Sequence, residues 1–446
     1  MTVTTLLADA SPEKQLFISL ITRDIPLVSA FLDLIDNSIN SAVEPFSKQL
    51  LTAEDYLRVL LDETIAPSVD IKLKINSDRV EIVDTATGIS AQTAKDHVFK
   101  FGRALNEKHD ADRLSVYGIG LKRAMFKLGN KITISSDHVD GGFDLVLDVR
   151  EWAKDSQTPW QFTITSRDPA KEGTTGTKIL IEELYDDCKR RISDGVFVSQ
   201  LKDAISKTYS FYLSKFVNIF VEEQKIEGTN IEIGTNNTAD SFIQETVSCA
   251  ITAGIGIPQG GMFKDKSSGW FVFCNGRTVI SSDKTSLTGW GELGLLPIFQ
   301  PKHRPFLGTV FFVSQDAELL PWTTTKSGIN EDSGIWQEAK RHMTAVGRTV
   351  ISFLDGRYTE AGTEVPPSEL KSATGDSVSV MSASVTPNRQ FSPPKYAPPE
   401  TVSVQYQAKV SDLKCIRKYL GRSNMSATEI GKHTFNHFLR NEIEEE

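Results

Sequence analysis

The sequence predicts an α+β protein whose first part is a two-layer α/β sandwich. Short stretches that alternate apolar and polar residues recur between residues 69 and 181, as expected of antiparallel strands with one covered face. Helical patterns at 91–99 and 121–128 interrupt these stretches, and a further one precedes them at 26–43. Helices combined with an antiparallel sheet favour two packed layers.

Turn signals and helix-start signals mark the limits of these elements. The strands predicted in this part cover 69–75, 79–83, 131–135, 143–149, 161–165 and 178–181. Polar or glycine turns separate several of them, for example at 76–78 and 140–142. The first helix is predicted to start at Pro26, because proline suits the first turn, where its missing N–H costs nothing.

The length of 446 residues predicts more than one domain, since single domains usually run to about 100–200 residues. We expect a first domain at 1–190 and a second α/β domain at 191–358. The second domain is predicted from helical patterns and strand-like runs, which are helices at 196–213 and 336–354 and strands at 216–222, 269–274, 278–280 and 308–313.

The remainder of the chain changes in texture. Residues 359–402 are rich in Ser, Pro, Thr, Ala and Gly, which predicts a flexible linker. Residues 403–446 regain a helical pattern over a length that is marginal for independent folding. Ser426 and Glu429 precede apolar residues there, as in a capped amphipathic helix.

The composition excludes several classes of protein. No apolar run reaches the roughly 18 residues of a membrane span, and the start of the chain makes a poor signal peptide. The four cysteines are far apart and form no C-x-x-C pair, which disfavours a disulfide framework or a zinc site and fits the cytoplasm. The net charge of -9 gives no general argument for binding nucleic acid or membranes.

The stretch 31–42 carries the first chemical signal. Asp33, Asp36, Asn37 and Asn40 are spaced to form one polar stripe on a helix. A solvated face would normally use long charged side chains, whereas Asp and Asn are poor helix formers. Short oxygen ligands on one face suit Mg²⁺ and a polarised water instead.

Three further motifs follow, each of which is weak by itself. Asp84 ends a predicted strand and precedes a small-residue turn that contains Gly88. A glycine pair, Gly118 and Gly120, starts a predicted helix and is followed by Lys122, a pattern that suits a phosphate. Thr177 lies in a Gly-Thr step before the last strand. The long polar segment 101–117 before the glycine pair is the length of a functional lid.

The order and spacing of the four motifs resemble those of the GHKL ATPases, the superfamily of gyrase B, heat-shock chaperones, histidine kinases and MutL. The resemblance covers residues 10–185 and implies the Bergerat-type ATP-binding fold, an α/β sandwich. It implies ATP and Mg²⁺ as cofactors and ATP hydrolysis as the activity. The arrangement of domains looks nearest to MORC-like or MutL-like proteins.

The resemblance also implies roles for individual residues. Asn37 matches the Mg²⁺ ligand, Asp84 the residue that recognises the adenine amino group, and Thr177 its hydroxyl partner. Gly88 would let the nucleotide approach the strand. The lid residues that would contact phosphate are Gly118, Gly120 and Lys122.

The sequence departs from the family pattern at two positions. Asp33 stands where hydrolysing members carry a Glu as general base, and its side chain is one methylene shorter, which changes its reach to the attacking water. Ala86 stands where the family often has Gly, which restricts positive φ but keeps the carboxylate of Asp84.

The second domain resembles the transducer domain of gyrase B and MutL. The stretch 271–279 contains an N-G-R-x-V motif, and 320–328 resembles the loop that delivers a lysine to the γ-phosphate. We expect Lys326 to be that lysine and therefore catalytic, with Lys302 and Arg304 as lesser candidates, because a cation there stabilises developing negative charge.

These observations favour an Mg²⁺-dependent ATPase that works as an ATP-gated switch, closing a homodimeric clamp on a macromolecular client. The basic residues of 403–446 suggest a docking unit for protein or nucleic acid. Two other functions fit the sequence: a non-hydrolysing ATP-sensing scaffold, which Asp33 would permit, and a DNA-binding clamp that ATP only regulates. A histidine kinase and a topoisomerase fit less well, because no phospho-accepting helix or cleavage domain is evident.

Overall fold

The structure, a computed structural model, describes residues 12–101, 114, 118–154, 159–361, 372–385, 389–392 and 404–442. The chain divides into two compact units, Met1–Pro394 and Lys395–Glu446, called the main unit and the C-terminal unit below. Within the described ranges, no helix has both the length and the apolar character needed to cross a membrane. The cysteines Cys188, Cys249, Cys274 and Cys415 are free.

The first sheet of the main unit has the strand order β5-β4-β3-β6-β2-β1-β7-β8. Its strands are β1 Val69–Ile75, β2 Arg79–Asp84, β3 Gly129–Asp137, β4 Phe143–Asp148, β5 Ile164–Ser166, β6 Gly176–Leu184, β7 Val217–Val221 and β8 Gln224–Ile226. Neighbours are antiparallel except β1 and β7, which run parallel. Residues along β1 are alternately buried and more exposed, so helices cover one face of the sheet and leave the other in contact with water.

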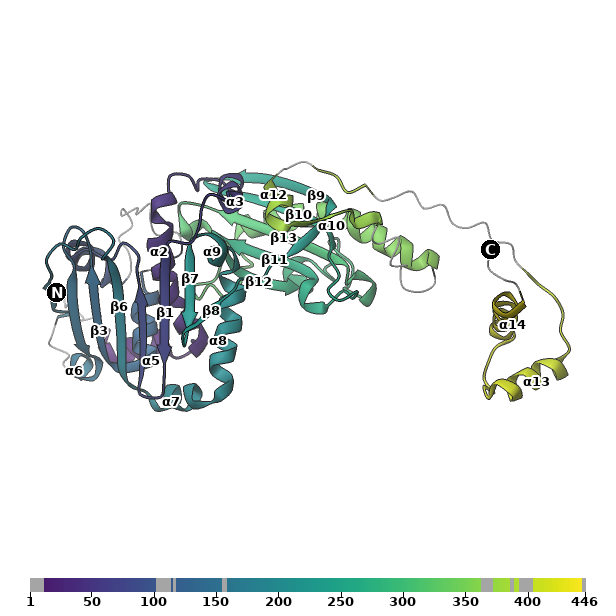
Figure 1. Cartoon of the computed structure of the whole chain (residues 1–446), viewed down its shortest axis with the longest axis horizontal. Coiled ribbons are helices and arrows are strands. Elements are labelled where there is room, and N and C mark those ends of the chain that lie inside the picture. The colour runs from purple at the N-terminus through teal and green to yellow at the C-terminus, as the bar shows by residue number, and fades with distance from the viewer. Residues whose placement is uncertain are drawn as a thin grey trace, which may run out of the picture. The chain divides into compact units, whose positions relative to one another are not determined.

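The helices of this part are amphipathic and lie together on one face of the sheet (Figure 1). They are α1 Lys14–Thr22, α2 Leu27–Val43, α4 Ala91–Thr93, α5 Gly120–Leu128, α6 Val149–Lys154, α7 Asp186–Ser193, α8 Gly195–Thr208 and α9 Ser210–Lys215, with the short turns η1 Glu44–Phe46 and η2 Ala94–Val98. Phe31, Ile35 and Ile39 of α2 are fully buried. Helix α2 also packs along α5, which brings the polar stripe and the glycine pair together.

The second sheet has the order β12-β11-β13-β10-β9-β14. Its strands are β9 Glu232–Gln244, β10 Val247–Gly256, β11 Gly269–Cys274, β12 Arg277–Asp283, β13 Phe306–Val313 and β14 Ser377–Ser379. Its helices are α3 Ala53–Leu61, α10 Gly334–Ala361 and α12 Val380–Val385, with the turns η3 Asp265–Ser267, η4 Ser286–Thr288, η5 Pro301–His303 and η6 Ala317–Leu319. Every residue of β10, β11 and β13 is buried, because helices cover both faces of this sheet.

The predicted α+β class is confirmed, with a second α/β domain after the first, but the limits within the chain differ from expectation. The first sheet ends at Ile226 rather than near 190, because β7 pairs with β1. Helix α10 continues to Ala361, beyond the expected end of the second domain at 358.

Part of the expected linker 359–402 is folded onto the second sheet. Strand β14 pairs with β9, and Val380 and Ala383 of α12 are buried. The hydroxyl groups of Thr252 and Ser384 are hydrogen-bonded at 3.0 Å. The linker prediction was therefore wrong for 372–385, because two buried apolar residues a helical turn apart suffice for docking even when Ser and Thr dominate the composition.

In the described part of the C-terminal unit, residues 404–442, the helices are α13 Val410–Leu420 and α14 Ala427–Glu442. The predicted cap of α14 is present: the backbone N–H of Ser426 donates to Glu429, and the backbone N–H of Glu429 donates to the Ser426 hydroxyl. Ile430 is buried in this unit.

Candidate functional site

Helix α2 turns its polar stripe toward the interior of the main unit. Asp33 and Asp36 are only 2% and 1% exposed, and Asn40 is 9% exposed. The amide oxygen of Asn40 accepts a hydrogen bond from the backbone N–H of Leu114. A solvated helix face is thereby excluded, and each buried carboxylate needs a partner.

Two cavities open beside this helix and share Asn37 as a wall. The first cavity has a volume of about 400 Å³ and lies between α2, the end of β2 and the start of α5. It contains Asn37, Asn40, Asp84, Gly88, Gly118 and Thr177 among its lining residues. Residues expected to hold the nucleotide therefore lie around one space, although they come from separate parts of the chain.

Asp84 lies at the floor of the first cavity, at the end of β2. One carboxylate oxygen accepts the Ser38 hydroxyl at 2.6 Å. The other accepts the backbone N–H groups of Ala86 and Thr177, each at 3.1 Å. Burial raises the pKa of Asp84, and these three donors oppose the rise. The carboxylate is thus fixed in direction, and its oxygens keep acceptor capacity toward the cavity.

The loop after Asp84 packs so closely on the sheet that it requires glycine. Gly88 has φ +72°, and a Cβ there would stand 2.0 Å from the carbonyl oxygen of Asp137. Gly88 is expected to let the nucleotide approach the strand. The backbone of Asp137 also excludes any side chain at this position. Ala86 is not among the positive-φ residues, so alanine suits that position.

Hydroxyl groups extend the polar floor of this cavity. The hydroxyls of Thr177 and Ser136 are hydrogen-bonded at 3.0 Å, and the backbone N–H of Ile89 donates to the Ser136 hydroxyl at 2.7 Å. Thr177 is 8% exposed. Its backbone and its side chain thus both belong to the network around Asp84.

The second cavity has a volume of about 380 Å³ and lies at the other side of Asn37. Carboxylates, cations and the start of α5 surround it. Its lining includes Asp24, Asp33, Asp36, Asn37, Gly120, Arg123, Thr324, Thr325 and Lys326. Lys326 is therefore brought to the same space as Asp33, although the two residues belong to different domains.

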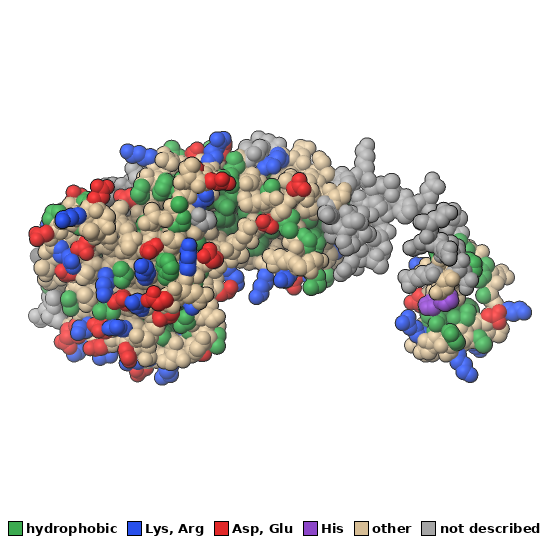
Figure 2. Space-filling model, viewed as in Figure 1, with side chains coloured by type: hydrophobic (Ala, Val, Ile, Leu, Met, Phe, Trp, Pro, Cys, Tyr) green, Lys and Arg blue, Asp and Glu red, His purple; other side chains and the backbone are tan. Residues whose placement is uncertain are grey.

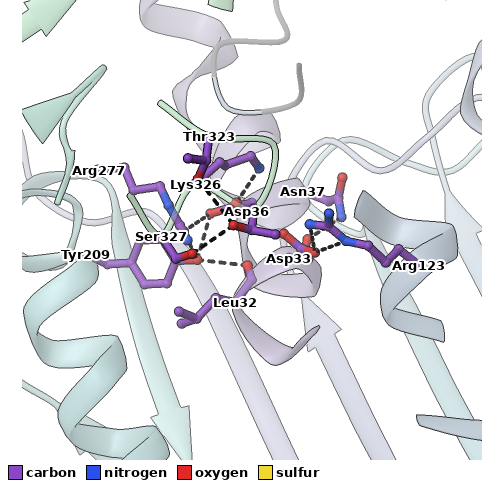
Figure 3. A network of polar contacts seen from close by, with 11 residues as sticks. Leu32, Asp33, Asp36, Asn37, Arg123, Tyr209, Arg277, Thr323, Lys326 and Ser327 are labelled. Carbon is purple, nitrogen blue, oxygen red and sulfur yellow. Dashed lines mark hydrogen bonds and ion pairs between the residues drawn. The ribbon is translucent and has the colours of Figure 1, made fainter. Parts of the chain in front are cut away.

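Asp33 is held from one side by Arg123 of α5 (Figure 3). Nε and Nη2 of Arg123 donate to the same oxygen, Oδ2, at 3.0 and 2.5 Å. The other oxygen, Oδ1, is buried and has no hydrogen-bond partner among the described residues. Burial raises the pKa of Asp33, which Lys326 and Arg123 oppose. Asp33 therefore presents an unsatisfied acceptor beside the second cavity, an arrangement that costs stability unless a ligand or water uses it.

Asp36 binds three groups that lie far from it along the chain. Arg277 and Tyr209 donate to Oδ1 at 2.6 and 2.7 Å, and Lys326 donates to Oδ2 at 2.6 Å, as Figure 3 shows. Burial acts to raise the pKa of Asp36, but Arg277 and Lys326 outweigh it and hold that pKa below its ordinary value. Lys326 itself has a positive φ of 52°, a backbone conformation that non-glycine residues rarely adopt.

The residues at the junction of the two cavities suit a metal and phosphates. The amide nitrogen of Asn37 donates to the carbonyl of Asp33 at 2.7 Å, which leaves its amide oxygen for a cation. Gly118 has φ +59°, and Gly120 begins α5 next to Asp33. The unpaired Oδ1 of Asp33 fits Mg²⁺ or a water, and the open N-terminus of α5 fits phosphate oxygens.

Some expected residues lie elsewhere. The Lys122 amine donates to the carbonyls of Val98 and Lys100 at 2.5 and 2.6 Å, and Lys122 lines neither cavity. Lys302 pairs with Asp355 and Arg304 with Asp265, in both cases away from the cavities. The expected lid 101–117 falls outside the described residues except Phe101 and Leu114.

Sequence reasoning assigned no role to several residues that complete the site, namely Ser38, Arg123, Ser136, Tyr209 and Arg277. Ser38 and Arg123 directly follow the assigned residues Asn37 and Lys122. Arg277 is the arginine of the N-G-R motif. Arg277 is the first residue of β12, whose sequence RTVISSD is mostly polar, so no contrast with apolar neighbours marked it in the sequence.

Comparison with known proteins agrees with this geometry. Residues 25–177 match the model of the histidine kinase-, DNA gyrase B-, and HSP90-like ATPase family. No curated protein matches the chain. The matched segment contains α2, Asp84, Gly118 and Thr177, which line the first cavity, and Gly120, which lines the second. Residues 25–177 therefore belong to the GHKL ATPase superfamily and form an ATP-binding domain of that type.

Proposed function

We propose that the chain binds ATP with Mg²⁺ across the two cavities and hydrolyses it, with Asp33 as general base. The observation that carries this proposal is the buried, unpartnered Oδ1 of Asp33 beside the second cavity. Asn37 and Lys326 line the same cavity. A free acceptor, a metal ligand and a cation within one space are the groups that phosphoryl transfer to water needs.

The nucleotide would lie with its adenine against Asp84 and its phosphates toward α5. The fixed carboxylate of Asp84 would accept the adenine amino group, with Thr177 beside it. Asn37 lines both cavities, so it would place the metal between the adenine end and the phosphate end of the nucleotide. Asn37 would hold Mg²⁺, which would offset the charge of the phosphates when bound.

The hydrolytic step needs a base on one side of the γ-phosphorus and a cation at its oxygens. Asp33 would accept a proton as the water oxygen bonds to phosphorus. The bond from phosphorus to the β–γ bridging oxygen would break, and ADP would leave with that electron pair. Lys326 would stabilise the charge on the transferring group. The products are ADP and phosphate.

We further propose that Lys326 couples the site to the second, transducer-like domain. Its present partner is Asp36, which keeps Arg277 and Tyr209 when Lys326 turns to a phosphate. Such an exchange would shift the conformation of the loop that carries Lys326, and with it the position of the second domain. Contacts to a γ-phosphate are a known way to switch conformation. We expect this switch to drive an ATP-dependent homodimer clamp.

The C-terminal unit supports a client-binding role for 403–446. Tyr406, Tyr419, Phe435 and Phe438 are exposed there, and Figure 2 shows hydrophobic and basic side chains together on this unit. An exposed apolar and basic surface suits a protein or nucleic-acid client. Salt-dependent DNA binding that deletion of 403–446 abolishes would favour the DNA clamp, and no DNA binding at low salt would exclude it.

The deciding experiment measures phosphate release and calorimetric ATP binding with Mg²⁺ for the wild type, Asp33→Asn and Lys326→Ala. We expect both variants to lose turnover and to keep ATP binding. Lys302→Ala is the matched control, because Lys302 pairs with Asp355 and lines neither cavity. Binding without turnover in the wild type would favour the ATP-sensing scaffold, and absence of binding would refute the proposal.

A further inference from the structure

Two cationic side chains line the second cavity, and each forms an ion pair with a carboxylate of α2. Arg123 pairs with Asp33, and Lys326 pairs with Asp36. Both pairs are almost completely buried, with side-chain exposures of 10% and 1% in the first and 8% and 2% in the second. Lys326 has an expected role at the γ-phosphate, whereas Arg123 has none so far.

The two carboxylates differ in what remains when a cation leaves. Asp36 keeps hydrogen bonds from Arg277 and Tyr209, so it stays neutralised. The side chain of Asp33 has hydrogen bonds from Arg123 alone within the described part of the chain. Loss of Arg123 would therefore turn Asp33 from a paired carboxylate into a fully available one.

The pair between Arg123 and Asp33 is incomplete as an ion pair. An arginine usually binds a carboxylate side-on, with two nitrogens on two oxygens. Here two nitrogens share Oδ2, and Oδ1 stays unpartnered. A tetrahedral phosphate offers more oxygens to the guanidinium than this arrangement uses, so a bound phosphate can compete with Asp33 for Arg123.

The position of Arg123 suits that exchange. It lies in the first turn of α5, since its backbone N–H donates to the carbonyl of Ile119, and α5 begins at Gly120. The positive end of the helix dipole favours an anion near this turn. Arg123, Gly120 and Lys326 all line the second cavity.

We propose that Arg123 is a γ-phosphate-binding residue that exchanges Asp33 for the terminal phosphate of ATP and thereby uncovers the base. This proposal rests on the proposed ATP-binding function. In the nucleotide-free protein the pair keeps Asp33 partly neutralised. When ATP is bound, Arg123 and Lys326 hold the γ-phosphate from two sides, and both Asp33 oxygens become available to water.

The test compares calorimetric binding of ADP and of the non-hydrolysable analogue AMP-PNP, each with Mg²⁺. For Arg123→Gln we expect the Kd of AMP-PNP to rise about tenfold or more, as for loss of a charge-assisted hydrogen bond, and the Kd of ADP to change by less than about threefold. Arg123→Lys should recover part of the loss. Lys127→Gln, one turn further along α5 and outside the second cavity, should leave both constants unchanged.

Arg123→Gln alone leaves Asp33 as an unpaired buried charge, which could unfold the protein. The double variant Asp33→Asn with Arg123→Gln removes both charges, so it controls for misfolding. The selective loss of AMP-PNP affinity should persist there relative to Asp33→Asn alone. An equal loss for ADP and AMP-PNP, no loss at all, or disappearance of the effect in the Asp33→Asn background would overturn the proposal. A wild-type protein that binds neither nucleotide would instead refute the proposed function.

Discussion

The carboxylate of Asp36 accepts a hydrogen bond of 2.6 Å from the guanidinium of Arg277, although the two residues are 241 positions apart. Asp36 belongs to the helix that lines both cavities, and Arg277 to strand β12 of the second sheet. The two side chains are 2% and 3% exposed. The ATP-binding domain and the second domain are thus joined through a buried ion pair.

Arg277→Ala should destabilise the main unit by about 3–5 kcal/mol, since removing one partner leaves a buried charge without full compensation. The free energy of unfolding in urea measures this. Arg304→Ala, which removes an exposed pair with Asp265, is the control and should change stability little. The double variant Asp36→Asn with Arg277→Ala should lose less stability than the sum of the losses in the two single variants.

Asp84→Asn should weaken ATP binding by roughly tenfold to a hundredfold while the fold persists, since an acceptor lost to a buried donor costs about 1–3 kcal/mol. The asparagine side chain has an NH₂ group in place of one carboxylate oxygen. That donor would face either the backbone N–H groups or the adenine amino group, which are donors themselves. Calorimetric binding of ATP gives the result, and far-UV circular dichroism checks the fold. Unchanged affinity would contradict the role of Asp84.

Gly88→Ala should destabilise the protein by more than about 2 kcal/mol, because it combines a positive φ with a steric clash. The added Cβ would stand 2.0 Å from the carbonyl oxygen of Asp137. Gly173→Ala is a matched control: Gly173 has φ +82° with nothing within 4 Å of an added Cβ. The difference in Tm between the two variants isolates the clash, and equal Tm values would argue against it.

Stability should fall as the pH drops below about 6.5, in part because of His303. Burial lowers the pKa of His303 from 6.5, which Asp355 opposes. The unfolded chain takes up the proton first, so it binds more protons than the folded state below pH 6.5, and stability falls by at most about 1.4 kcal/mol per pH unit. His303→Gln should flatten the slope of Tm between pH 7.5 and 5. The pKa of Asp355 is lowered from 3.8, so the stability that its carboxylate contributes is lost only at pH values below this range.

Val380→Asp should destabilise the main unit by about 2–5 kcal/mol, because a carboxylate would replace a buried apolar side chain. Val380 lies on α12 in the segment that the sequence predicted to be a linker. Ser382→Asp on the exposed side of the same helix is the control. If thermal unfolding of the two variants were alike, α12 would not contribute to the core.

The regular alternation of the first sheet made it predictable from the sequence, and the second sheet shows why alternation sometimes fails. Strand β1 was predicted with its observed limits, since its residues alternate between covered and exposed faces. Strand β9 went unpredicted. Its Thr, Asn, Asp and Gly content resembles a loop, and it forms a strand because β10 and β14 pair on both of its sides.

The site was predictable where one local segment carries the chemistry. Asn37 and Asp84 lie at the cavities because each belongs to a compact motif. Lys122 was placed at the phosphates, but its amine instead satisfies the carbonyls of Val98 and Lys100. The partners Arg123 and Arg277 depend on contacts across the fold, which spacing along the chain does not reveal.

The segment that matches the ATPase family cannot behave as an independent protein. Residues 25–177 lack strand β7, which pairs with β1, and they lack Tyr209, Arg277 and Lys326, the donors that neutralise Asp36. A fragment cut at these limits would expose a sheet edge and leave a buried carboxylate uncompensated. The second domain should therefore stabilise the proposed nucleotide site, and nucleotide binding should by linkage protect both domains from proteolysis.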